Sequence, residues 1–115
     1  MVSIKRIFAA FYETAAGTAP VREWLLELSR EDRKTIGEDI ATVEYGWPLG
    51  MPVCRPLGRQ LFEVRSTISG NRIARVLFSI VGNRMVLLHG FIKKTQKTPD
   101  DDLTLARRRL KEIKK

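Results

Sequence analysis

The 115-residue sequence is poor in the residues that build disulfides, metal sites and membrane helices. Its lone cysteine, Cys54, excludes an internal disulfide and favours a reducing compartment. With His89 as the single histidine, a cysteine/histidine zinc site is excluded as well. No apolar run approaches the roughly 20 residues that a membrane helix needs, and the N-terminal apolar stretch is too short for a signal peptide. We expect a cytoplasmic protein that contacts no membrane and holds no metal or other cofactor.

What the sequence does have is an excess of positive charge in one half. Residues 1–58 hold 7 Lys/Arg against 8 Asp/Glu, whereas residues 59–115 hold 14 against 5. Ordinary protein surfaces intersperse both signs, so a merely solubilising surface is the weaker interpretation. A localised basic field favours a polyanionic partner, with nucleic acid the first candidate and an acidic protein or a membrane surface the next.

The length and the 43% hydrophobic content predict one globular domain spanning residues 1–115. Apolar periodicity, turn residues and helix caps predict an α+β fold. The first expected elements are an N-terminal strand over 3–11 and a two-helix antiparallel pair, whose helices start at Pro20 and at the cap residue Ser29. A structured loop over 47–60 and a three-stranded antiparallel meander over 61–65, 75–79 and 84–92 follow. The last element is a C-terminal helix starting at 98–101, with an apolar stripe of Leu103, Ala106, Leu110 and Ile113.

Two arginines stand out on the first hairpin of this meander. Centring the turn on Gly70 pairs Arg65 with Arg75. The same register pairs Phe62 with Phe78 and Val64 with Val76, which places those four on the core side and the arginines on the other, exposed face. Like charges directly opposite each other destabilise a sheet by about 0.2–1 kcal/mol. A phosphate that bridges the two guanidinium groups would explain why both are present.

The second hairpin turns at Gly82-Asn83. A two-residue turn there pairs Ile80 with Met85, Phe78 with Leu87, Val76 with His89 and Arg75 with Gly90. This register places His89 on the core side, which favours a hydrogen-bonded core residue over a catalyst. Because Gly90 has no side chain, the same register leaves open space beside Arg75. Alternation then puts Lys94 on the arginine face, and a bulge at Gly90 would put Lys93 there instead.

Charged runs mark the C-terminal helix. Asp100, Asp101 and Asp102 lie where acidic residues stabilise a helix N-terminus, which is a better explanation than a cation site. Residues 107–109 are consecutive arginines that we expect on a solvated face, with polyanion binding or docking of an acidic partner as an additional role.

The run His89-Gly90-Phe91-Ile92-Lys93-Lys94, followed by Thr95-Gln96-Lys97-Thr98-Pro99, resembles the hallmark of the phage-derived HigB-like branch of the RelE/ParE toxin superfamily. The segments 61–65 and 75–78 and the order of elements are also similar to that superfamily. The resemblance implies the toxin of a type II toxin-antitoxin pair, a metal-independent endoribonuclease that cleaves mRNA in the ribosomal decoding site. Its partners would be the ribosome, mRNA and a cognate antitoxin, expected to be a helix-turn-helix DNA-binding protein.

In such an enzyme the RNA 2′-hydroxyl attacks the adjacent phosphate, so the site must move protons and stabilise charge. By position, Arg75 corresponds to the superfamily's catalytic arginine, Arg65 to a basic residue on the preceding strand, and Lys93 or Lys94 to a basic residue after the fourth strand. A lysine whose pKa is lowered by neighbouring cations could act as acid or base. We take as RNA-binding candidates Arg59, His89, Gln96 and Lys97.

The general acid and base stay open. Other RelE-like members have lysines near the positions of Leu61 and Glu63 and a late catalytic tyrosine, whereas the tyrosines here are Tyr12 and Tyr45. Two other functions are compatible with the architecture: a ParE-like inhibitor of DNA gyrase, which lacks such a basic cluster, and a non-enzymatic RNA-binding module, which would favour exposed aromatic platforms.

Overall fold

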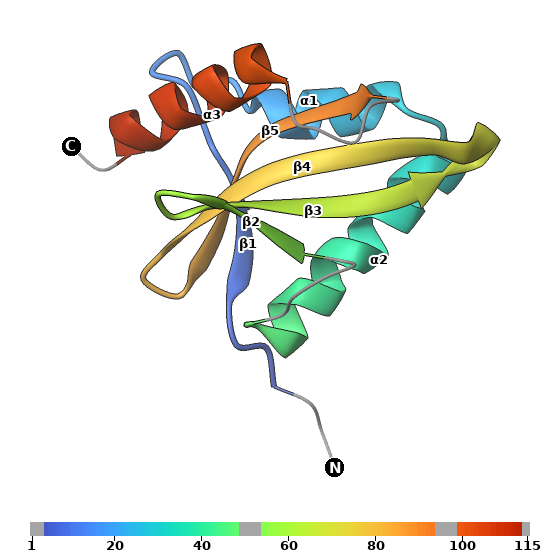
Figure 1. The fold of residues 1–115 in the computed structure, drawn as a ribbon, viewed down its shortest axis with the longest axis horizontal. Helices are drawn as coiled ribbons and strands as arrows, with labels where there is room; N and C mark the ends of the chain where they lie inside the picture. Colours follow the sequence, from blue (N-terminus) through green and yellow to red (C-terminus); the bar gives the residue numbers. More distant parts are fainter. Residues whose placement is uncertain (1–3, 49–53, 94–98, 114–115) are drawn as a thin grey trace.

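A computed structural model describes residues 4–48, 54–93 and 99–113 (Figure 1). The elements are β1 (Phe8–Phe11), α1 (Pro20–Glu27), α2 (Arg30–Gly46), β2 (Cys54–Gly58), β3 (Leu61–Ile68), the 3-10 turn η1 (Ser69–Asn71), β4 (Arg72–Val81), β5 (Arg84–Lys93) and α3 (Asp100–Ile113). The strands form a single five-stranded sheet in the order β1-β5-β4-β3-β2, in which β1 runs parallel to β5 and all other neighbours are antiparallel. The α+β class is confirmed, and β3, β4 and β5 pair as the predicted antiparallel meander, but a sheet of three meander strands is wrong because β1 and β2 extend it to five.

The unexpected strand, β2, lies within the predicted loop over 47–60. It contains Pro56 and ends at Gly58, which are both strand-breaking residues. β2 is an edge strand, where a residue without a backbone N–H costs no ladder hydrogen bond on the solvent side. Its register against β3 shifts between Pro56 and Gly58. The proline and glycine therefore mark an irregular edge strand here and not a loop.

The N-terminal strand is shorter than predicted. The backbone N–H groups of Arg6 and Ile7 both donate to the carbonyl of Glu44 in α2, at 2.8 and 3.2 Å. The Glu44 side chain also accepts from the backbone N–H of Ala9 at 2.7 Å. The end of α2 thus takes up backbone groups that would otherwise extend β1 toward residue 3.

The three helices cover both faces of the sheet, and Figure 1 shows the sheet between α2 and α3. Helices α1 and α2 pack on one face over a shared apolar cluster, and α3 packs on the other face over a second cluster. The α3 stripe predicted from the sequence is confirmed, since Leu103, Ala106, Leu110 and Ile113 all belong to the second cluster. Within the described ranges, no helix is long and apolar enough to cross a membrane.

A β-bulge in β5 changes the predicted register of the second hairpin. The pairs Ile80–Met85 and Phe78–Leu87 are confirmed, but the next pair is Leu77 with His89, so Leu88 is an extra residue. The predicted pairs Val76–His89 and Arg75–Gly90 are therefore wrong. The carbonyl of Leu88 accepts a hydrogen bond of 2.7 Å from Arg109 of α3, which satisfies a backbone group at the irregular position.

Gly90 has a packing role that differs from the predicted one. It pairs with Val76 and not with Arg75, and it meets the indole of Trp24 in α1. A Cβ atom built on Gly90 would lie 2.4 Å from Trp24 Cε3, closer than side chains can approach. The glycine therefore allows α1 to dock on β5; it does not open space beside Arg75.

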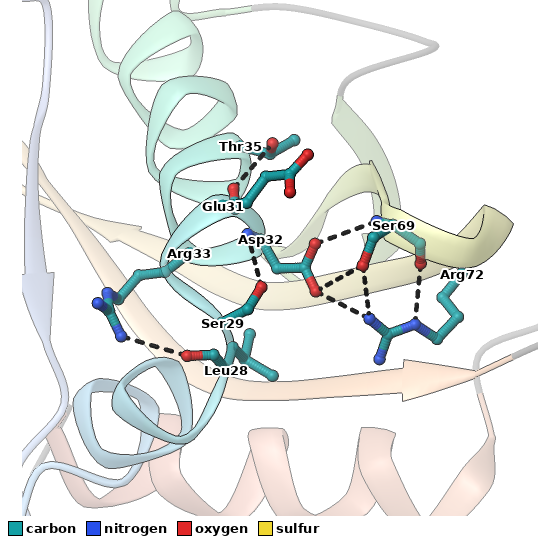
Figure 2. A network of polar contacts seen from close by, with 8 residues as sticks. All are labelled: Leu28, Ser29, Glu31, Asp32, Arg33, Thr35, Ser69 and Arg72. Atoms are coloured by element: carbon teal, nitrogen blue, oxygen red, sulfur yellow. Dashed lines mark hydrogen bonds and ion pairs between the residues drawn. The ribbon is translucent and has the colours of Figure 1, made fainter.

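The tip of the β3–β4 hairpin is tied to the start of α2 by a buried carboxylate (Figure 2). Ser29 caps α2 by accepting from the backbone N–H of Asp32 at 3.1 Å, as the sequence predicts. The Asp32 carboxylate accepts from the backbone N–H and hydroxyl of Ser69, at 3.1 and 3.0 Å, and from Arg72 Nη2 at 2.8 Å. These bonds, led by the backbone donor of Ser69, lower the pKa of Asp32.

We predict that Asp32→Asn lowers the stability of the protein at pH 7. Because the folded state lowers the pKa of Asp32, this stabilisation is present above the ordinary carboxyl pKa and is lost as pH falls through the lowered value. Thermal denaturation followed by circular dichroism should show a lower midpoint for the variant at pH 7, with the difference shrinking as the pH falls below about 4. The control is Glu31→Gln, which changes an exposed neighbour; a pH-independent difference for Asp32→Asn would contradict the carboxylate's role.

Candidate functional site

The cross-strand arginine pair predicted from the sequence is present. Arg65 of β3 pairs with Arg75 of β4, so both lie on the same face of the sheet, which we call the arginine face. Their exposure differs: the Arg65 side chain is 17% exposed and that of Arg75 is fully buried. The expectation that both guanidinium groups are exposed is therefore wrong for Arg75, which lies on a central strand of the sheet.

The carboxylate of Glu63 lies between the two arginines. Glu63 precedes Arg65 by two residues and so shares the arginine face. Its two oxygens form ion pairs of 3.9 Å, one with Arg65 Nε and the other with Arg75 Nη1, and its side chain is completely buried. The chain thus supplies an anion of its own where the sequence predicts a bridging phosphate.

A third arginine joins this cluster from β2. Arg55 pairs directly with Glu63 across the two strands, so it lies on the arginine face as well. Burial lowers the pKa of Arg75, the Glu63 carboxylate opposes this shift, and the positive charges of Arg65 and Arg55 add to it. We call Arg55, Glu63, Arg65 and Arg75 the arginine cluster; three guanidinium groups against one carboxylate leave it net positive. Sequence analysis missed Arg55 because β2 reads as a loop.

The bulge at Leu88 decides which residues of β5 join the arginine face. Phe91 now pairs with Arg75, and the backbone of Lys93 pairs with Ile73 of β4. A bulge was considered at Gly90, and the structure places it two residues earlier. The other predicted residues of this segment, Lys94, Gln96 and Lys97, lie outside the described residues.

His89 is not on the core side of the sheet that carries Val76, as the sequence predicted, because the bulge pairs it with Leu77. Its Nε2 lies 2.6 Å from Asp102 Oδ1 of α3. The ring also stacks on Phe91, with centroids 5.3 Å apart and planes 23° from parallel. The single histidine therefore lies on the arginine face, held by a carboxylate and an aromatic ring.

Arg59 lies apart from the arginine cluster, at the exposed turn between β2 and β3. It lines a shallow hollow together with Arg107, Leu110 and Lys111 of α3. Arg107 donates to the carbonyls of Leu57 and Gly58, at 3.3 and 3.4 Å. A second basic surface thus lies beside α3, where the sequence predicts a solvated face with polyanion binding or docking of an acidic partner as an additional role.

Two kinds of chemistry find no support in the described residues. Burial, with a smaller contribution from Glu63, raises the pKa of the Cys54 thiol to about 11, so the thiolate needed of a nucleophile is scarce at neutral pH. In the described part of the chain, no three His, Cys, Asp or Glu side chains are grouped as a metal site. Asp102, one of the three acidic residues at the start of α3, binds His89 instead.

The architecture defines a basic α+β protein with an arginine cluster on one sheet face. The family model of phage-derived Gp49-like proteins (DUF891) matches residues 23–111. The chain belongs to this family, which is RelE-like and toxin-like. No curated protein matches the chain significantly. The matched range contains the arginine cluster, His89 and nearly all of α3.

We predict that Glu63→Gln destabilises the protein by about 1–3 kcal/mol, because it removes the buried acceptor charge between two arginines. Adding Arg65→Gln to this variant should restore part of the loss by relieving the opposition of like charges. Urea denaturation of the wild type, both single variants and the double variant forms a double-mutant cycle.

Glu38→Gln, an exposed change on α2, is the matched control for the loss of one carboxylate. If Glu63→Gln and Glu38→Gln have the same small effect, the carboxylate of Glu63 does not hold the arginine pair.

Proposed function

We propose that this protein is the toxin of a type II toxin-antitoxin system, in the HigB-like branch of the RelE/ParE superfamily, and that it cleaves mRNA on the ribosome. The observation that carries this proposal is the arginine cluster around Glu63, on one sheet face of a chain whose family is toxin-like. The excess of positive charge over residues 59–115 supports an RNA partner.

The cluster is suited to the charge that develops during RNA cleavage. When a 2′-hydroxyl attacks the neighbouring phosphate, negative charge accumulates on the phosphate oxygens, and preorganised cations stabilise that state. Arg65 is the partly exposed member of the pair, so we assign to it the direct contact with the phosphate. Arg75 and Arg55 add positive potential, and Glu63 fixes the position of the guanidinium groups before substrate arrives.

Other basic residues complete the proposal. Lys93, the last residue of β5, and Lys94, the next residue in the sequence, are proposed as further catalytic cations, as the family resemblance implies. Arg59, Gln96 and Lys97 are proposed to bind RNA, and the basic surface of Arg59, Arg107 and Lys111 would share phosphate contacts away from the reacting bond. An acidic or sterically blocking antitoxin in the cytoplasm would neutralise the toxin.

Expression of the protein without an antitoxin should arrest bacterial growth. Arg65→Ala should relieve the arrest and lower single-turnover cleavage of ribosome-bound mRNA by about 10² or more, the scale of losing one preorganised electrostatic group. Ribosome affinity should fall much less, because each distributed cation contributes only one unit to the salt dependence. The measurements are growth after induction and product formation with purified ribosomes.

The matched control is Arg84→Ala, which removes an exposed arginine at the other end of β5 and should leave arrest and cleavage intact. Inhibition of DNA gyrase without mRNA cleavage would support the ParE-like alternative. Ribosome binding without cleavage or growth arrest would support a non-enzymatic RNA-binding module. Either result would overturn the proposed function.

A further inference from the structure

We propose that His89 is the general base of this site and that Asp102 is the residue that positions it. The inference rests on the proposed ribonuclease function and supplies the proton acceptor that sequence comparison leaves open. It is carried by the contact between His89 of β5 and Asp102 of α3 on the arginine face.

The geometry determines which ring nitrogen can accept a proton. His89 Nε2 lies 2.6 Å from Asp102 Oδ1, and an ionised carboxylate is only an acceptor. The Nε2–H group of the neutral ring therefore donates to Asp102, and Nδ1 carries the lone pair. A carboxylate that orients an imidazole in this way also stabilises the imidazolium formed when the ring accepts a proton.

The position of the ring places it with the arginine cluster. His89 stacks on Phe91, and Phe91 pairs directly with Arg75, so imidazole and guanidinium belong to neighbouring rows of one sheet face. The His89 side chain is 16% exposed, close to the 17% of Arg65. Both are thus accessible to a substrate, unlike the buried Arg75.

The charged groups that contact His89 or its neighbour, or share its sheet face, come from several elements. Asp102 and Arg109 come from α3, and Arg109 bonds to the carbonyl of Leu88, the residue before the histidine. Arg75 of β4 and Glu63 of β3 lie on the same face. Without the bulge at Leu88, His89 would face α1 and α2 on the other side of the sheet.

In the proposed step, Nδ1 of His89 takes the proton of the 2′-hydroxyl as the 2′-oxygen forms its bond to phosphorus. The bond between phosphorus and the 5′-oxygen breaks, and the leaving 5′-oxygen takes a proton from water. His89 then returns its proton to solvent, which leaves a 2′,3′-cyclic phosphate and a 5′-hydroxyl. The step needs no reactant other than RNA and water.

The competing interpretation is that His89 and Asp102 only hold α3 on the sheet. The chain offers a matched control for that role at the other end of α3. There the hydroxyl of Tyr12, the residue after β1, donates to Glu112. Tyr12→Phe removes a polar contact between α3 and the rest of the fold without touching the proposed site.

The test compares the wild type with His89→Gln, Asp102→Asn and Tyr12→Phe in single-turnover cleavage of ribosome-bound mRNA across a pH series, alongside thermal denaturation. His89→Gln should cleave about 10²–10⁴-fold more slowly and lose the fall in rate toward low pH, because glutamine does not titrate. Asp102→Asn should cleave about tenfold more slowly or worse. Tyr12→Phe should keep the wild-type rate and pH profile, and all variants should bind ribosomes normally.

Wild-type rates and pH profiles in a folded His89→Gln would overturn the inference and leave the proposed function standing. If His89→Gln does not fold, Asp102→Asn decides: an unchanged cleavage rate overturns the inference, and a slowed rate with normal ribosome binding supports it. Absence of cleavage by the wild type would overturn the proposed function and the inference with it.

Discussion

The arginine cluster depends on one buried carboxylate. Glu63 lies where three arginines from three strands meet, and its oxygens form ion pairs with Arg65 and Arg75. Removing an arginine from water is costly unless a counter-charge accompanies it. With Glu63 in place, Arg75 can occupy a central strand, fully buried, while the cluster keeps a net positive charge toward solvent. Glu63 thereby positions the arginines without any ligand, and the proposed charge stabilisation requires preorganisation of this kind.

The second constraint is the bulge at Leu88, which determines what stands beside the arginines. It moves His89 and Phe91 onto the arginine face and turns Gly90 toward Trp24 on the opposite face. Helix α3 contributes to both features, because Arg109 bonds to the carbonyl of Leu88 and Asp102 to the imidazole of His89. Within the segment His89-Gly90-Phe91, the glycine thus packs against α1, whereas His89 and the buried Phe91 lie on the arginine face.

Sequence reasoning succeeded where local rules decide the outcome. Alternation and the turn at Gly70 predicted the pairing of Arg65 with Arg75, and the cap at Ser29 predicted the start of α2. It failed where distant contacts decide. The residues that contact the bulged part of β5, Arg109 and Trp24, are far from it in sequence, and the edge position of β2 makes Pro56 tolerable. The sequence shows Glu63 two residues before Arg65, but its burial and its ion pair with Arg75 follow from packing that local patterns do not encode.

The central claim is that the arginine face promotes attack of the 2′-hydroxyl on the adjacent phosphate of ribosome-bound mRNA. Chemical identification of the RNA ends formed by the purified protein on translating ribosomes tests it most directly. We expect a 2′,3′-cyclic phosphate on the upstream fragment and a 5′-hydroxyl on the downstream fragment. A 3′-hydroxyl paired with a 5′-phosphate, or intact mRNA, would contradict it.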